Sequence, residues 1–138
     1  FRICVPYGNN IGEGYSYGTL GFFLSKAMKG EDITLFGDGS IRRTFTHVED
    51  ISRIIIESIG QENTKNEIFN IGGENLSLKA AAELVAERYG VQVKTVDWPE
   101  MALKLESDDT VFDDGKIRKF LDISYRRNIA SWIKGLNK

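Results

Sequence analysis

The chain has 138 residues, of which 41% are hydrophobic and 28% are charged, so its composition is that of a globular protein with a core. A net charge of −2 excludes nucleic-acid binding driven by overall charge, although a local basic patch is compatible with it, and we expect no nucleic-acid partner. No apolar run approaches the roughly 20 residues that a membrane span needs, so we expect no membrane partner. A single cysteine excludes an internal disulfide and fits a reducing compartment, which predicts a cytoplasmic protein.

The first residues enter an apolar run directly, without an initiating Met and without a signal peptide. The letters FRICV predict a buried strand over residues 2–5, which Pro6 and Gly8 end. Because a domain seldom opens inside a strand, we expect the chain to be part of a larger protein. A loop rich in Gly and Asn follows over residues 8–18.

Residues 19–29 predict an amphipathic helix, because apolar residues recur at helical spacing and Gly30 follows as a C-cap. A short strand is predicted over residues 32–36. The letters GDG at residues 37–39 predict a turn. This turn is expected to join the strand to an extended run over residues 42–48 as a hairpin.

A helix over residues 49–59 is predicted by two acidic residues in its first turn, where the helix dipole favours negative charge. A second buried strand is predicted over residues 67–71. Ser77 is the expected N-cap of a further helix over residues 78–89. The helix over residues 49–59 is expected to bury one face, which carries Ile51, Ile54, Ile55, Ile56 and Ile59.

The last third of the sequence predicts one strand and two helices. Residues 91–98 alternate like a strand, residues 113–121 predict a short helix, and residues 127–136 predict a final amphipathic helix. Residues 100–112 give no clear pattern. Strands and helices in rough alternation indicate the α/β class. The two buried strands resemble parallel strands whose neighbours lie outside the chain.

Arg42 and Arg43 follow the GDG turn on an extended run, so their side chains are expected to point to opposite faces. An inward guanidinium needs an anionic partner, and its planar fork suits phosphate oxygens. The residues alone leave two interpretations open, a plain turn and a phosphate site.

The other reactive residues favour structural roles. His47, the only histidine, is interpreted as a hydrogen-bonded structural residue, and Cys4 as a packed, unreactive thiol. Because the sequence has no Cys/His cluster, we expect no metal. The aspartate pairs at 108–109 and 113–114 lack the Gly and Glu pattern of a calcium loop and are interpreted as solvated turns or a helix start.

Three motifs of the chain resemble those of one known family. The most specific is GDG…R.F.HVED over residues 37–50, and FNIGG and DDGK follow it in the same order. From Arg2 to about Leu136 the chain is similar to the C-terminal part of the NAD-dependent epimerase/dehydratase family, the extended short-chain dehydrogenase/reductases that act on nucleotide sugars. The resemblance implies an α/β fold in which residues 1–138 form a substrate-binding region with late strands of a Rossmann sheet.

The catalytic motifs of that family do not occur in this sequence. Its members carry a glycine-rich NAD motif and a Tyr-x-x-x-Lys pair in an N-terminal Rossmann domain, and neither is found here. The resemblance therefore implies the nucleotide-sugar-binding part of an epimerase or dehydratase, without a catalytic residue and unable to turn over substrate by itself. The cofactor, NAD or NADP, would be bound mainly by the N-terminal domain, and the full-length protein would be a homodimer.

The resemblance also assigns roles to single residues. Arg43 matches the arginine that grips the diphosphate of the nucleotide sugar, and the backbone of Phe36 matches the position that meets the base. Phe45 matches an aromatic residue beside that pocket. Thr19 and Leu20 match positions at the phosphates, and Ile3 and Cys4 match positions at the nicotinamide. Lys104 lies near the position of the family's second phosphate-binding arginine.

Three positions depart from the family pattern and leave the sugar and the nucleotide open. Val5 stands where Asn often helps to bind the substrate, Thr44 stands where Asp is frequent, and Lys104 lies where the second arginine is expected. Lysine binds phosphate as a point charge, without a bidentate fork. Two alternatives also stay open: a non-catalytic nucleotide-sugar-binding or regulatory member of the same fold, and an unrelated α/β domain that uses GDG only as a turn.

Overall fold

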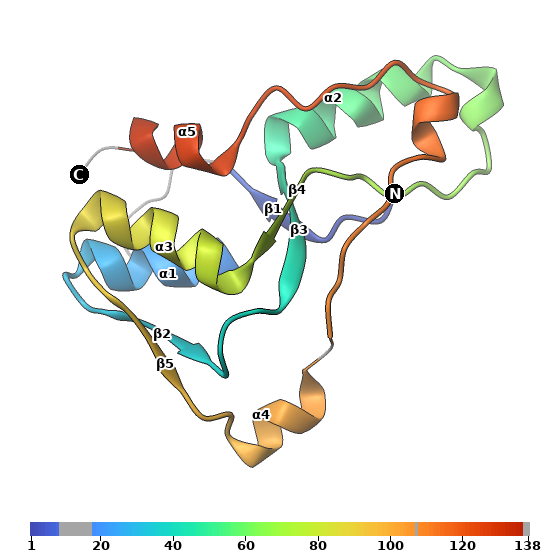
Figure 1. Ribbon diagram of the computed structural model, residues 1–138. Coiled ribbons are helices and arrows are strands. Elements are labelled where there is room, and N and C mark those ends of the chain that lie inside the picture. The colour runs from blue at the N-terminus through green and yellow to red at the C-terminus, as the bar shows by residue number, and fades with distance from the viewer. Residues whose placement is uncertain (9–17, 107, 137–138) are drawn as a thin grey trace.

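Within residues 1–8, 18–106 and 108–136, which the computed structural model describes, two small sheets pack against helices (Figure 1). One sheet has the order β1 (Val5–Tyr7), β3 (Arg42–His47), β4 (Glu74–Ser77). In it β1 is parallel to β3 and β4 is antiparallel to β3. The other sheet pairs β2 (Ile33–Phe36) in parallel with β5 (Val93–Val96). Parallel pairs with helices between them confirm the predicted α/β class.

The N-terminal strand lies later in the chain than predicted. It is β1 that pairs with β3, so that Tyr7 lies opposite His47, whereas Arg2 makes only an isolated parallel bridge to Asn70. The predicted strand over residues 2–5 is therefore wrong in its bounds, and the predicted strand over residues 67–71 is wrong, because that segment makes only the isolated bridge. Pro6 does not end β1, because β1 lies at the sheet edge, where a missing N–H is tolerated.

The predicted hairpin is also wrong. The strands on either side of the GDG turn, β2 and β3, belong to different sheets. The turn is instead held by two later elements, because the Gly37 N–H donates to Val96 O at 2.8 Å and the Lys79 N–H donates to Gly39 O at 3.0 Å. A turn residue pattern does not say which strands will pair, because pairing depends on tertiary packing.

The helices α1 (Gly18–Met28) and α3 (Leu78–Tyr89) pack together, and α5 (Ile129–Gly135) packs on α3 (Figure 1). The expected N-cap is confirmed, because the Ser77 hydroxyl accepts a hydrogen bond from the Ala80 N–H. These helices and β2 enclose the larger core, whose fully buried members include Leu24, Ile33, Val85 and Ile129. None of the described helices has the length and apolar character that crossing a membrane requires.

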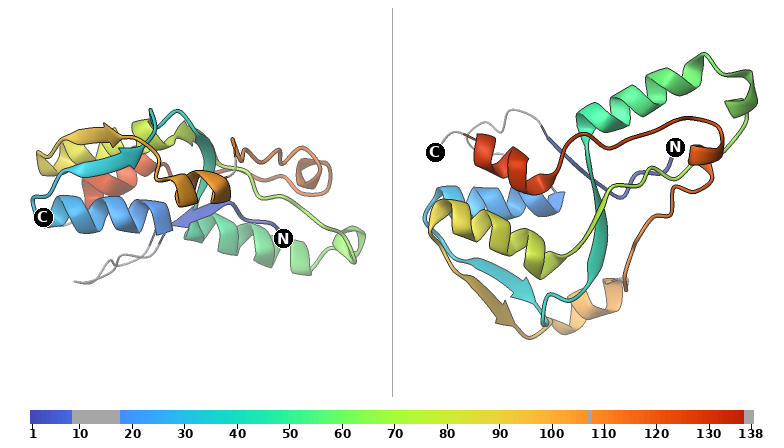
Figure 2. Two further views of the ribbon diagram at one scale, coloured as in Figure 1. Left: turned by 90° about the horizontal axis from the view of Figure 1, so that it is seen from below. Right: turned by 45° about the horizontal axis from the view of Figure 1, so that its top comes forward.

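A second core lies beneath α2 (Val48–Ile59), where Ile51 and Ile54 pack against the chain around Phe69 and Ile71. Figure 2 (left) shows α2 and the segment around the 3-10 helix η2 (Ile117–Lys119) on opposite sides of this chain. The expected short helix over residues 113–121 is only this 3-10 turn. The predicted apolar face of α2 is partly wrong, because the side chains of Ile56 and Ile59 are 68% and 77% exposed.

Three further elements complete the description: the short 3-10 helix η1 (Glu62–Thr64), the helix α4 (Glu100–Leu105) and the antiparallel strand β4. None of the three was predicted. The helix α4 lies beyond the carboxyl end of β5, away from the other helices (Figure 1). The predicted loop over residues 8–18 falls mostly outside the described residues.

Candidate functional site

The GDG turn is confirmed as a tight turn with a locally satisfied aspartate. Gly37 and Gly39 have φ values of +66° and +71°, which residues with a side chain rarely adopt. The Asp38 carboxylate accepts a hydrogen bond from the Ser40 N–H at 2.9 Å, so it closes the turn on itself. The turn therefore delivers the chain to β3 without supplying a ligand group from its aspartate.

The two arginines of β3 have different environments, as the alternation along a strand predicts. Arg42 is exposed, and its guanidinium donates to Asn75 O at 3.1 Å. The Arg43 side chain is only 13% exposed and reaches the Glu106 carboxylate at 2.5 Å. Its Nη1 also donates to Asp108 O at 3.0 Å. Arg43 is thus the inward guanidinium, and Glu106 is an anionic partner that the sequence did not reveal.

A pocket of about 560 Å³ lies beside this ion pair. Its wall includes Thr19 from α1, Phe36 from β2, and Trp98 and Glu106 from the segment after β5. The rings of Phe36 and Trp98 lie 5.4 Å apart with an interplanar angle of 41°. We call this the Trp98 pocket; it combines aromatic side chains with a carboxylate that pairs with Arg43.

The structure places the residues predicted to bind substrate at different depths. Thr19 and Phe36 line the Trp98 pocket, and Arg43 adjoins it through Glu106. Leu20 and Phe45 are 3% and 1% exposed and pack in the larger core, so they offer almost no surface to a ligand. Lys104 lies on α4, where its Nζ lies 3.0 Å from the Glu100 carboxylate at the surface.

The two residues predicted to touch the nicotinamide lie near the start of β1. The Ile3 side chain is exposed, whereas Cys4 is half-buried and lies outside any strand. The Cys4 thiol donates to Thr110 O at 3.4 Å, and Thr110 forms a parallel bridge with Arg43. Cys4 and Arg43 therefore flank the same stretch of chain, which brings the two predicted ligand positions to one region.

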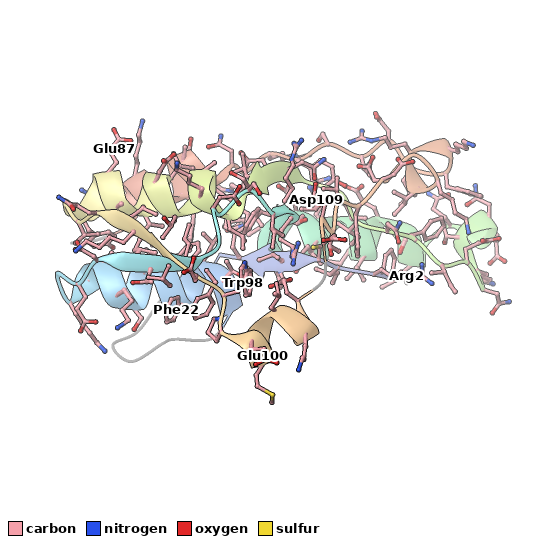
Figure 3. The ribbon with its side chains drawn as sticks, turned by 60° about the horizontal axis from the view of Figure 1, so that its bottom comes forward. Arg2, Phe22, Glu87, Trp98, Glu100 and Asp109 are labelled. Carbon is pink, nitrogen blue, oxygen red and sulfur yellow. The ribbon has the colours of Figure 1, made fainter. Side chains whose placement is uncertain are left out.

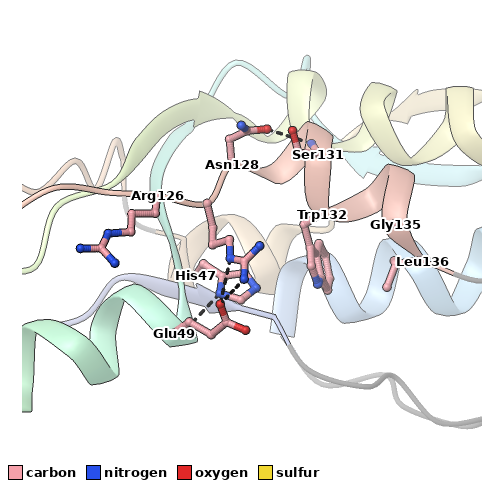
Figure 4. Close-up of a pocket in the computed structure, with 9 residues that line it drawn as sticks. His47, Glu49, Arg126, Asn128, Ser131, Trp132, Gly135 and Leu136 are labelled. Carbon is pink, nitrogen blue, oxygen red and sulfur yellow. Dashed lines mark hydrogen bonds and ion pairs between the residues drawn. The ribbon is translucent and has the colours of Figure 1, made fainter.

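A second pocket of about 540 Å³ lies at the carboxyl end of β3 (Figure 4). We call it the His47 pocket, and its wall includes Glu49, Arg127 and Trp132. The His47 Nδ1 accepts a hydrogen bond from the Glu49 N–H at 3.2 Å and caps α2, which confirms the predicted structural role. Burial lowers the pKa of His47 below its usual value, with a smaller contribution in the same direction from Arg127.

Asp50 joins α2 to the C-terminal segment. Its buried carboxylate accepts from the Arg53 guanidinium at 2.8 Å and from the N–H groups of Arg126 and Arg127 at 2.9 and 3.1 Å. From the sequence alone, Asp50 was expected only to interact favourably with the dipole of the helix that it begins. Its three hydrogen-bond partners come mostly from more than 70 residues away, so no local pattern could indicate them.

Three of the four aspartates considered for a metal accept hydrogen bonds from other groups of the protein. Asp109 accepts from the Arg42 N–H at 2.7 Å, and Asp113 accepts from the Gly115 N–H at 2.7 Å. Burial acts to raise the pKa of Asp114, but hydrogen bonds from Arg118 and Tyr125 outweigh it and lower that pKa. Among the described residues, no three His, Cys, Asp or Glu side chains come together as a metal site would require.

The family comparison matches residues 1–72 to the NAD dependent epimerase/dehydratase family. A UDP-N-acetyl-alpha-D-glucosaminuronate decarboxylase of Bacillus cytotoxicus is 35% identical over 69 residues, which are 50% of this chain and 21% of that protein. A putative UDP-glucose 4-epimerase of Methanocaldococcus jannaschii is 28% identical over 96 residues, covering 69% of this chain and 30% of that protein.

Solved structures show the same fold. The UDP-glucose 4-epimerase of Thermotoga maritima, with UDP-glucose, superposes with a TM-score of 0.78 at 21% identity, covering 96% of this chain and 42% of that one. The UDP-glucuronic acid 4-epimerase of Bacillus cereus, in complex with UDP-glucuronic acid and NAD, gives 0.78 at 21% identity, covering 96% and 41%. The chain thus spans less than half the length of these relatives.

Proposed function

The chain belongs to the NAD-dependent epimerase/dehydratase family, and on this premise we propose that it is the nucleotide-sugar-binding part of an epimerase or dehydratase. The family match rules out the alternative of an unrelated α/β domain. The observation that carries the proposal is the largely buried Arg43 side chain, whose guanidinium pairs with Glu106 at the wall of the Trp98 pocket. A guanidinium in that position suits a diphosphate, because its Nη2, which now contacts Glu106, can donate a charge-assisted hydrogen bond to an anionic oxygen.

In this proposal the diphosphate takes the place of the Glu106 carboxylate on Arg43. Both partners are anionic, so the exchange leaves the guanidinium charge neutralised. The nucleoside occupies the Trp98 pocket beside Phe36, and the Thr19 hydroxyl lies in its wall as a neutral hydrogen-bonding group. This arrangement uses the predicted residues Arg43, Phe36 and Thr19 directly.

The other assigned substrate residues have indirect or peripheral roles in the proposal. Leu20 and Phe45 are buried, so they support the pocket from the core by fixing α1 and β3. Lys104 lies on α4 and is exposed, so its ammonium can reach a phosphate only as a mobile point charge. We therefore expect Arg43 to contribute most of the phosphate affinity.

The described residues fit only one end of the NAD that the family uses. Ile3 offers exposed apolar surface, and Cys4 lies beside it with its thiol bonded to Thr110 O, so these two residues would contact the nicotinamide. When bound, NAD supplies the ring carbon that accepts and returns a hydride. The sequence has no glycine-rich motif for the NAD phosphates and no Tyr-x-x-x-Lys pair.

We accordingly assign residues 1–138 to the C-terminal region of a longer enzyme, whose N-terminal Rossmann domain holds NAD and the catalytic pair. The parent would be an isomerase or a lyase, homodimeric and cytoplasmic, and this chain alone would not turn over substrate. The lack of a Tyr-x-x-x-Lys pair also suits the non-catalytic alternative. Turnover of a nucleotide sugar by the parent distinguishes the enzyme from a binding protein.

The test is calorimetric titration of the protein with UDP, dTDP, GDP and CDP sugars, comparing the Arg43→Ala and Arg42→Ala variants. Loss of a charge-assisted contact should weaken binding by about 1.5–3 kcal/mol in Arg43→Ala. Arg42→Ala is the matched control, because Arg42 is adjacent but exposed and bonded to Asn75 O. An unchanged affinity for nucleotide sugars in a folded Arg43→Ala variant would show that Arg43 does not bind the substrate.

A further inference from the structure

We propose that Trp98 stacks on the nucleobase of the bound nucleotide and that Gly37 of the GDG turn sets the position of its indole. The inference rests on the proposed function, which it deepens by naming the residue that recognises the base. Trp98 lies in the segment between β5 and α4. Figure 3 shows it beside Phe22 on the face that carries α4, and both residues line the Trp98 pocket.

The indole of Trp98 is fixed by its contact with the turn. A Cβ atom built on Gly37 would lie 2.4 Å from Trp98 Nε1, closer than real side chains approach, so only glycine leaves room for the ring. The Gly37 N–H also donates to Val96 O at 2.8 Å, which ties the turn to the strand that leads to Trp98. The turn therefore does more than redirect the chain, because it presents an aromatic ring to the pocket.

The polarity of the pocket matches the order of groups in a nucleotide. Its apolar wall carries the exposed rings of Phe22 and Phe36 together with Trp98. The one charged side chain among its described lining residues is Glu106, which pairs with Arg43. A nucleotide presents an aromatic base at one end and a diphosphate at the other. Stacking on Trp98 and an ion pair with Arg43 would satisfy both ends at once.

The nucleobase is a better occupant of the aromatic wall than the sugar. Hydroxyl groups of a sugar need hydrogen-bond partners, and among the described lining residues Thr19 and Thr34 supply only two side-chain hydroxyls besides Glu106. Any base has a flat π face, so stacking requires no such partners. Trp98 is thus assigned to the base, and the sugar extends past Arg43.

The second tryptophan provides an internal reference. Trp132 lies in the wall of the His47 pocket, where its ring packs against Tyr7 at 5.2 Å. The chain has only two tryptophans, so the variants Trp132→Phe and Trp98→Phe each leave one fluorescent indole. Titration with UDP should change the emission of Trp98 in the first variant saturably, and should leave the emission of Trp132 in the second unchanged.

Affinity is measured in parallel by calorimetry with UDP. Stacking on an aromatic side chain predicts that Trp98→Ala binds UDP roughly 5- to 150-fold more weakly, whereas Trp98→Phe retains most of the affinity. If Trp98→Ala does not fold, the two single-tryptophan variants still decide the question by fluorescence. UDP binding that leaves Trp98 emission unchanged, or a folded Trp98→Ala variant within twofold of wild type, overturns the inference while the proposed function stands. No binding of UDP, dTDP, GDP or CDP to the unaltered protein overturns the proposed function itself.

The role of Gly37 is tested with a matched glycine. Gly30 has nearly the same φ, +72° against +66°, but an added Cβ there meets nothing within 4 Å. Gly37→Ala and Gly30→Ala therefore impose similar backbone strain, and only Gly37→Ala displaces the Trp98 ring. We expect UDP affinity to fall in Gly37→Ala and to stay at the wild-type value in Gly30→Ala. Equal UDP affinities in the two variants would show that Gly37 does not set the position of the Trp98 indole.

Discussion

The Trp98 pocket and the His47 pocket adjoin opposite ends of β3, and they are built from similar parts. Each is lined by a tryptophan and by a glutamate that pairs with an arginine, Glu106 with Arg43 in one and Glu49 with Arg127 in the other. In each pocket a ring also lies close against a glycine. A Cβ added to Gly8 would lie 2.4 Å from His47 Nε2, and a Cβ added to Gly37 would lie 2.4 Å from Trp98 Nε1.

The two pockets differ in how far their ion pairs are buried and in which hydrogen bonds their side chains make. The side chains of Arg43 and Glu106 are 13% and 26% exposed, against 57% and 60% for Arg127 and Glu49. Exposed pairs are screened by water, whereas a largely buried guanidinium keeps most of its attraction for an anion. The His47 ring is committed to capping α2, so this pocket is built mainly for stability. Similar residues thus do different work according to their burial.

The largest expected effect is on stability at the His47 end. Asp50→Ala should lower the free energy of unfolding by about 3 kcal/mol, because it leaves the Arg53 charge and two backbone N–H groups without their buried acceptor. Denaturant unfolding monitored by circular dichroism measures this loss. The neighbouring variant Glu49→Ala removes only an exposed ion pair and should cost at most about 1 kcal/mol. Equal losses in the two variants would contradict the role assigned to Asp50.

A smaller, pH-dependent effect is expected from His47. Burial lowers its pKa in the folded state, although Glu49 and Asp50 oppose this effect and Arg127 reinforces it. A lowered folded pKa means that the stabilisation is present above the unfolded value of about 6.5. It is lost as the pH falls through the folded value, because a protonated Nδ1 can no longer accept the Glu49 N–H. His47→Ala should remove about 1 kcal/mol of capping energy at pH 7.5.

The control for this prediction is His47→Asn. Asparagine is a good N-cap that does not titrate, so it should retain stability at pH 7.5 and flatten the pH dependence that develops as the pH falls below about 6.5. His47 is the only histidine, so no other imidazole contributes to the profile in that range. A pH dependence of unfolding that is the same in His47→Asn and the unaltered protein would exclude His47 as its source.

The smallest expected effect concerns the exposed ion pair. Arg127→Ala should change the free energy of unfolding by no more than about 0.5 kcal/mol, because the pair with Glu49 is largely exposed. The pKa of His47 should rise, because Arg127 lowers it. An NMR titration of the single imidazole measures this shift directly. A fall in the His47 pKa would show that Arg127 acts on His47 through structure rather than through charge.

Much of the secondary structure could be predicted because its signals are local. Apolar spacing and caps indicated α1 and α3, and Ser77 was correctly predicted as an N-cap. Strand alternation separated Arg42 from Arg43 correctly. Which strands pair is a long-range property, and there the hairpin at the GDG turn and the bounds of the N-terminal strand were wrong.

The candidate site divides in the same way. The motif around Arg43 indicated the family and the guanidinium, but Glu106 and Trp98 were missed because they lie in or next to a segment without a readable period. A tryptophan just before Pro99, at the end of a strand, was the one available signal. It indicates a boundary and says nothing of what the indole will contact.

The sequence by itself determined the α/β class, the family, the turn at residues 37–39 and the opposite directions of Arg42 and Arg43, because each depends on neighbours within a few residues or on a motif. Only the tertiary structure decided that the Nε1 edge of the Trp98 indole lies against Gly37 and that Glu106 lies 2.5 Å from Arg43. Those contacts join residues about 60 positions apart. Their existence depends on how β5 and α4 pack against β2 and β3, which no local pattern encodes.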